Sequence, residues 1–279
     1  MSRPKVHHCN SVATYMQAVE DFKRDFKKEQ NKEQPSNLKA DGKKEDRLFF
    51  FRGHADSMWK CKPAIAREPF TLDAIYDGTP RPSRDNAEWV LFSRFRAMSA
   101  ALEPLCVASV PRVEADWRRV VLAQHHELPT RLLDWTTKSL VALYFAVQAR
   151  GRGVAETDSV VVAASRLRPQ VFSVYALAEM NRTPPCYSPE NGEDVGFFWA
   201  PDIHQRVTLQ GSVLSIGRKP TQEIDVEGRF KISKKYRRTI RDELYHLGIH
   251  EASLFPDLDG IARSLVAESK MWGPLQGVD

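Results

Sequence analysis

Apolar residues recur every three to four positions in several stretches of the chain, a spacing that predicts amphipathic helices. The first stretch follows Ser11, a residue type favoured at helix N-caps. Two more predicted helices cover residues 86–102 and 113–124, and the second must end before Pro129. A helix over 138–150 is apolar on nearly every side, which indicates a central position. The first of these helices places on one side Val12, Tyr15, Met16, Val19, Phe22 and Phe26.

Short runs rich in β-branched and aromatic residues dominate the second half and predict β-strands. One earlier strand is predicted over residues 47–51. A late helix over 233–247 is expected to stop at Gly248, a typical C-terminal cap. This order predicts an α+β fold, with N-terminal helices packed on a mostly antiparallel sheet. The later predicted strands cover residues 158–164, 171–175, 196–200 and 206–216, and a last one, Leu254-Phe255-Pro256-Asp257, leads into a turn.

Composition and charge are those of an ordinary globular chain with enough apolar residues for a large core, 42% of 279. The net charge of +5 mildly favours anionic partners such as nucleic acid. Four dispersed cysteines, the absence of a long apolar run and a polar N-terminus predict a cytoplasmic protein without a membrane partner. Residues 27–46 interleave charges of both signs, which predicts a solvated mobile loop rather than a nucleic-acid-binding arm.

The tripeptide Phe51-Arg52-Gly53 ends the first predicted strand and is the first candidate for chemistry. Arg52 offers a planar, permanently charged fork of donors that suits phosphate or carboxylate groups. Gly53 allows the backbone to turn sharply or to approach a ligand closely. The structural alternative is a strand-end arginine paired with a nearby acid.

The block 124–136 concentrates imidazoles, hydroxyls, a carboxylate and another arginine. His125 and His126 are adjacent, so on a helix they diverge by about 100° and at most one faces a pocket. No His-x-x-x-His pair or cysteine cluster is present, so no metal site is expected. Arg131 and Asp134 are expected to form a local ion pair that fixes the turn.

Three further features carry polar groups. Thr130, directly after a proline, places a hydroxyl on a rigid loop, whereas Tyr144 on the central helix is expected to be a core residue with a hydrogen-bonded hydroxyl. Glu251, before the last predicted strand, fits an ordinary surface carboxylate. Residues 229–241 hold seven cations without an acid, a pattern suited either to a phosphate backbone or to a solvated helix face. Four of these cations are expected to share one helix face: Lys234, Arg237, Arg238 and Arg241.

The tripeptide, the block 124–136 and the segment Ala142-Leu143-Tyr144-Phe145-Ala146 together resemble the FRG domain of bacterial and phage proteins. The likeness continues through residues 206–210 and 254–260, so it covers roughly residues 50–267. On this basis the chain divides into an N-terminal helix with a charged loop (1–46), the FRG domain (47–270) and a short tail (271–279).

The order of these motifs is also similar to that of ADP-ribosyltransferases. Their site opens with an aromatic-Arg-Gly strand, continues with a hydroxyl-bearing element, and ends with a glutamate near an apolar pair and a proline. This likeness implies a split β-sheet core, with NAD as the substrate and no metal. By analogy Arg52 would hold the NAD pyrophosphate or nicotinamide ribose, and the region around His126 would line the nicotinamide pocket. Glu251 would bond the ribose 2′-hydroxyl and stabilise an oxocarbenium-like transition state. The other cofactor-binding residues implied are Gly53, Thr130, Arg131, Asp134 and Tyr144.

The glutamate departs from that pattern. The sequence His250-Glu251-Ala252-Ser253-Leu254-Phe255-Pro256 places it two residues early and without a second acid, so Asp134 or Glu127 are alternative catalytic carboxylates. The first hypothesis is an NAD-dependent ADP-ribosyltransferase that modifies nucleic acid, RNA favoured, or a protein, as a toxin or antiviral effector restrained by an antitoxin partner. The second is a non-catalytic module that binds a nucleotide or nucleic acid. A nuclease fits less well, because no cluster of acids for two metal ions is present.

Overall fold

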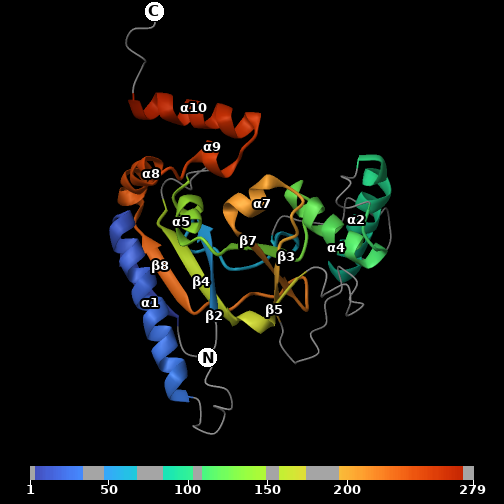
Figure 1. Ribbon diagram of the computed structural model, residues 1–279, viewed down its shortest axis with the longest axis horizontal. Helices are drawn as coiled ribbons and strands as arrows, with labels where there is room; N and C mark the ends of the chain where they lie inside the picture. Colours follow the sequence, from blue (N-terminus) through green and yellow to red (C-terminus); the bar gives the residue numbers. More distant parts are fainter. Residues whose placement is uncertain are drawn as a thin grey trace, which may run out of the picture.

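A computed structural model describes residues 4–33, 47–67, 84–102, 109–148, 157–173 and 195–272. Its centre is one mixed sheet of eight strands, with helices on one face (Figure 1). The strands are β1 (Lys5–Cys9), β2 (Arg47–His54), β3 (Leu132–Thr136), β4 (Ser159–Leu167), β5 (Val171–Phe172), β6 (Val195–Trp199), β7 (Ser212–Gly217) and β8 (Gly228–Ile232). The helices are α1 (Val12–Glu33), α2 (Arg84–Ser99), α4 (Arg112–His125), α5 (Ser139–Val147), α7 (Gln205–Gln210), α8 (Arg237–His246), α9 (Glu251–Leu254) and α10 (Leu258–Trp272).

The sheet has the strand order β1-β8-β4-β2-β3-β7-β6-β5, and only its two outermost pairs are parallel. The prediction of a mostly antiparallel α+β fold is therefore confirmed. The centre of the sheet is its weakest point, because β2 and β3 are joined only at the residue pair Phe51 and Thr136. By contrast, β2 pairs with β4 along its whole length, from Arg47 to His54. The sheet is thus divided into two four-stranded halves that separate beyond Phe51.

One core fills the space between the half of the sheet formed by β1, β8, β4 and β2 and the helices α1, α5 and α8 (Figure 1). Tyr15, Val19 and Phe22 of α1 are almost fully buried there, as the helical spacing predicts. Helix α5 is apolar on nearly all sides and packs directly on β2, so its predicted central position is confirmed. Burial of such side chains contributes about 1.5–3 kcal/mol each to folding.

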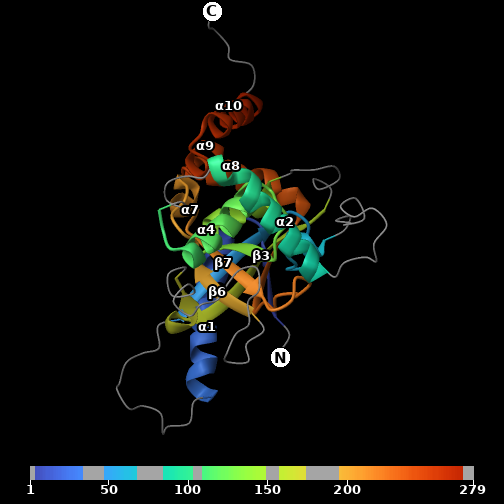
Figure 2. The ribbon, with the colours of Figure 1, turned by 90° about the vertical axis from the view of Figure 1, so that its right-hand side faces the viewer.

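A second core lies on the other half of the sheet, under α2 and α4. Trp117, Val120 and Val121 of α4 pack there against Leu132 of β3 and neighbouring residues of β6 and β7. Figure 2 shows α4 and α2 in front of this half of the sheet. A third core covers the opposite face, where Phe50, Leu133 and Trp135 are buried together. Two helical groups thus share one face, one on each side of the division between β2 and β3.

Several local predictions are wrong. Residues 206–216 contain α7 followed by β7 instead of one strand: the His204 side chain accepts a hydrogen bond from the Arg206 N–H, and Gly211 ends the helix with a left-handed φ of 60°. The predicted strand at 254–257 is instead the last residue of α9 followed by the connection to α10, and α9 is a short helix over Glu251–Leu254. Its first turn is stabilised by Ser253, whose hydroxyl accepts from the His250 N–H at 3.0 Å. Runs this short do not distinguish a strand from a helix by pattern alone.

The order of elements also differs from the expected one, because helices and strands alternate and three helices end the chain. Strand β1 was not predicted, and α1 continues to Glu33 into the segment expected to be a loop. Residues 34–46 of that loop lie outside the described residues, as do residues 174–175 of the predicted strand 171–175 and residues 273–279 of the tail. Strand β1 pairs with β8, and α1 shares the first core, so both elements are integrated with the rest of the fold. None of the helices in the described ranges combines the length and apolarity that a membrane-spanning segment needs.

Candidate functional site

Arg52 lies where β2 and β3 separate. Phe51 and Gly53 face α5, so strand alternation directs the Arg52 side chain to the opposite face of β2. Its Nη1 donates to the backbone oxygen of Asp134, 2.6 Å away, and lies 4.0 Å from Asp134 Oδ2. Its Nε donates to His54 Nε2 at 3.1 Å. These bonds hold the guanidinium across the division of the sheet, with 18% of the side chain exposed and further donors available.

Gly53 has a structural role that differs from the predicted contact with a ligand. A Cβ atom at this position would lie 2.1 Å from the backbone oxygen of Ala142 and 2.5 Å from the backbone nitrogen of Ala146. Both atoms belong to α5, so the glycine permits this helix to lie directly on β2. Its place in the predicted cofactor site is therefore corrected: the close approach is by the protein's own helix.

Asp134 is the carboxylate that forms an ion pair with Arg52, and 66% of its side chain is exposed. Gln124 at the end of α4 donates from Nε2 to Asp134 Oδ1 at 2.7 Å. The Gln124 amide is itself oriented by Thr130, whose hydroxyl donates to Gln124 Oε1 at 2.5 Å and accepts from the Leu132 N–H. Thr130 therefore acts through Gln124, and these two residues form with Asp134 one connected polar network beside Arg52.

Of the two adjacent histidines, His125 is partly buried and close enough to Asp134 to be influenced by its charge, whereas His126 is exposed at the end of α4. The His125 ring lies 4.9 Å from that of His204, at the start of α7. Burial, followed by the charge of Arg206 and the proximity of His204, lowers the pKa of His125, whereas Asp134 opposes this shift. A lowered pKa favours the neutral form of His125 near pH 7, whereas the role predicted for His126 stays a prediction.

The predicted ion pair between Arg131 and Asp134 is wrong, because Arg131 points into the protein. Its Nε donates to Glu88 Oε2 at 2.6 Å, and its backbone N–H donates to Glu88 Oε1 at 2.9 Å. Both side chains are almost fully buried. Arg131 thus joins α2 to the start of β3 and is not available to a cofactor. Successive residues of a strand face opposite sides, so a spacing of three does not bring their side chains together.

Glu251 and Tyr144 form a separate cluster. Glu251 is buried at the start of α9, where Oε2 accepts from the Tyr144 hydroxyl and Oε1 accepts from Arg263 Nε at 2.7 Å. Tyr144 is on α5, which packs on the face of β2 opposite to the Arg52 side chain. The predicted grouping of Arg52 with Glu251 is therefore corrected, as is the prediction of a surface carboxylate: the residue beside Arg52 is Asp134, one of the alternatives that the sequence left open.

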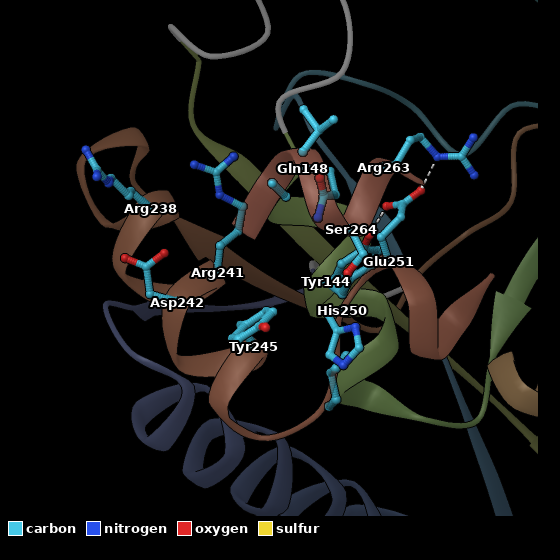
Figure 3. Close-up of a pocket in the computed structure, with 13 residues that line it drawn as sticks. Tyr144, Gln148, Arg238, Arg241, Asp242, Tyr245, His250, Glu251, Arg263 and Ser264 are labelled. Carbon is cyan, nitrogen blue, oxygen red and sulfur yellow. Dashed lines mark hydrogen bonds and ion pairs between the residues drawn. The ribbon is translucent and has the colours of Figure 1, made fainter. Parts of the chain in front are cut away.

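A cavity of about 480 Å³ lies between α5, α8, α9 and α10, next to the Glu251 cluster (Figure 3). In Figure 3, Arg238 and Arg241 extend from α8 on one side, and Tyr144 and Glu251 lie on the other. Neither Arg52 nor Asp134 is part of its wall.

The predicted basic face is only partly real. Arg237 is buried, and its guanidinium donates to the backbone oxygens of four residues at the ends of β2, α5 and β4. It stabilises the fold and is not available to a phosphate, so its predicted nucleic-acid contact is corrected. Lys234 is exposed but lies in a separate 3₁₀ turn, Lys234–Tyr236, before α8 begins. Arg238 and Arg241 remain on the surface of the cavity.

Four residues that contact or influence the candidate residues were not predicted from the sequence: His54 and Arg67 near Arg52, His204 beside His125, and Arg263 bonded to Glu251. Burial and the neighbouring Arg52 lower the pKa of His54 to about 3. Burial and the charge of Arg52 also lower the pKa of Arg67, while Asp134 raises it, which places a second cation near this pair. His54 lies two residues after Arg52 on β2. Side chains two residues apart on a strand face the same side, so the strand alternation could have identified His54. The other three come from distant segments and have no local signal.

The comparisons with known proteins give one result. The FRG domain model matches residues 47–153, a range that contains the tripeptide, the block 124–136 and α5. The predicted likeness extended further, to about residue 267. Neither the curated proteins nor the solved structures include a significant match. The chain therefore contains an FRG domain at residues 47–153.

Proposed function

We propose that this protein binds NAD at the junction of β2 and β3 and transfers its ADP-ribose group to a nucleic acid, RNA favoured, or to a protein. The observation that carries the proposal is the guanidinium of Arg52, held across the division of the sheet beside the exposed carboxylate of Asp134. A fixed guanidinium with free donors suits a diphosphate. Arg67 adds a second positive charge at this place.

The transfer reaction needs a carboxylate near the ribose. When the bond between ribose C1′ and the nicotinamide nitrogen breaks, both electrons leave with nicotinamide and positive charge develops at C1′. A carboxylate stabilises such an oxocarbenium-like centre. Asp134 is suited to this role because Gln124 fixes one of its oxygens while the side chain stays exposed.

The acceptor must lose a proton as its oxygen or nitrogen bonds to C1′. His125 is suited to take that proton, since its lowered pKa keeps it neutral near pH 7. It belongs to the same network through its neighbour Gln124. An enzyme of this kind would act as a toxin or an antiviral effector and would require an antitoxin partner, as the sequence-based hypothesis states.

A second candidate function is a non-catalytic module that binds a nucleotide or nucleic acid. The observation that favours it is the placement of Glu251, which pairs with Tyr144 and Arg263 away from Arg52. In this alternative, Arg52 and Arg67 bind phosphate groups, and Asp134 only positions Arg52.

Incubation of the purified protein with NAD labelled in its adenylate part, together with RNA, DNA or protein, tests the proposal. We expect release of nicotinamide and labelling of one acceptor by the wild type, and loss of both with Arg52→Ala. Asp134→Asn should reduce turnover at least about hundredfold while NAD still binds, because only the charge at C1′ is lost. Arg24→Ala, which removes an exposed arginine of α1, is the matched control. Binding of NAD without turnover by the wild type would favour the second candidate, and the absence of NAD binding would refute the first.

A further inference from the structure

The cavity between α5, α8, α9 and α10 is large enough for a small molecule. Its volume of about 480 Å³ falls in the range of about 300–1,000 Å³ that is typical of ligand sites. Four separate helices form its wall, and the side chains directed to it include both charged groups and rings (Figure 3).

One side of the cavity carries two available cations. Arg238 and Arg241 lie one turn apart on α8 and extend in the same general direction (Figure 3). Within the described ranges, neither guanidinium has an ion pair or a hydrogen bond with the protein. Arg237, directly before them on α8, differs, since it is buried and bonded to backbone oxygens. Two adjacent free guanidinium groups at a concave surface are suited to the phosphates of a ligand.

The opposite side carries a fixed hydrogen-bond acceptor. Glu251 Oε2 accepts a hydrogen bond from the Tyr144 hydroxyl, and Oε1 accepts one from Arg263 Nε at 2.7 Å. An ionised carboxylate only accepts hydrogen bonds, and it has about four acceptor sites on its two oxygens. Because both partners hold the carboxylate in place, it is positioned to bind a hydroxyl group, such as that of a ribose.

Two rings lie in the cavity wall between these groups. The rings of Tyr245 and His250 have centroids 5.2 Å apart and an interplanar angle of 41°. The Nδ1 atom of His250 is buried and lacks a hydrogen-bond partner among the described residues. Such an atom is uncommon in a folded protein and can be satisfied by a ligand with a polar ring. Aromatic side chains also provide a surface on which a planar base can stack.

We propose that this cavity binds a nucleoside di- or triphosphate. Its phosphates contact Arg238 and Arg241, its base packs at Tyr245 and His250, and its ribose hydroxyl groups bond to Glu251. This site is separate from the Arg52 junction, and its occupation does not depend on the proposed transfer reaction.

Isothermal titration of the full-length protein with ATP, GTP, pyrophosphate and adenosine tests this inference. We expect ATP or GTP to bind more tightly than either fragment alone. The double variant Arg238→Gln and Arg241→Gln should weaken this binding at least about tenfold for each lost charge-assisted contact. Lys235→Gln is the matched control, because Lys235 is a neighbouring exposed cation that does not line the cavity. It should leave the affinity unchanged.

Three outcomes would overturn the inference. Absence of binding of both nucleotides to the wild type is the first. The second is an equal loss of nucleotide affinity in the double variant and in Lys235→Gln, which would mean that the arginines act only through the general positive charge of the surface. Loss of nucleotide binding in Arg52→Ala, but not in the double variant, would place the nucleotide at the β2–β3 junction instead. These three outcomes are all measured as nucleotide binding. They can therefore be told apart from a failure of the proposed transfer reaction, which is measured as NAD turnover.

Discussion

Replacement of Gly53 by alanine tests how tightly α5 is held on β2. The added methyl group would meet backbone atoms of Ala142 and Ala146 at 2.1 and 2.5 Å, whereas real contacts of this kind begin near 3.0 Å. Helix α5 would have to withdraw by about 0.9 Å. Overpacking of a core costs about 1–3 kcal/mol, and occasionally more. Since both obstacles are backbone atoms of a buried helix, we expect a loss near the upper value, about 3 kcal/mol.

Urea denaturation followed by tryptophan fluorescence measures this loss in the free energy of unfolding. Gly248→Ala is the matched control, because Gly248 has a left-handed φ of 76° but open space within 4 Å. Its cost is backbone strain alone, about 1–2 kcal/mol. If Gly53→Ala destabilises the protein no more than Gly248→Ala, then α5 does not rest directly on β2 and the explanation of this glycine is wrong.

Three other substitutions test buried polar groups. Glu88→Gln leaves the buried guanidinium of Arg131 without its counter-charge, and should reduce the free energy of unfolding by about 3–5 kcal/mol in urea denaturation. Arg237→Gln should cost several kcal/mol, because backbone oxygens lose a shared donor, whereas Arg238→Gln on the surface should change thermal stability by less than about 0.5 kcal/mol. His54 has its folded pKa lowered to about 3, so as pH falls below about 6.5 the unfolded state takes up the proton first and stability declines. Wild type should therefore lose up to about 1.4 kcal/mol more per pH unit than His54→Asn between pH 6 and 4.5.

Regular helices and the sheet type could be predicted from the sequence because they depend on local periodicity. The central position of α5 can be predicted because apolar residues occur on nearly all of its sides. The C-terminal end of α8 near Gly248 can be predicted from the conformational freedom of glycine. Strand β1 was missed because a polar edge strand such as Lys5–Cys9 has no apolar pattern, and its position depends on pairing with β8. Predictions failed where a distant partner decides the structure.

The candidate site shows the same limit at the level of single residues. Arg131 was assigned to a local pair, but its partner Glu88 lies 43 residues earlier. Glu251 was compared with a catalytic glutamate, but it is held by Tyr144, 107 residues away, and by Arg263. Residue type and local spacing identified groups with reactive chemistry. They could not determine which of those groups a tertiary contact leaves available.

The tripeptide itself shows how three adjacent residues produce one functional position. Phe51 fills the core on the α5 side of β2, and Gly53 on the same side removes the Cβ atom that would push α5 away. Strand geometry then directs Arg52 between them to the other face. Because β2 and β3 share only one residue pair, the backbone oxygen of Asp134 is left without a partner on β2 and accepts from the Arg52 guanidinium. The arginine thus replaces part of the missing backbone pairing, so removing it should both expose this oxygen and widen the junction at which the ligand is proposed to bind.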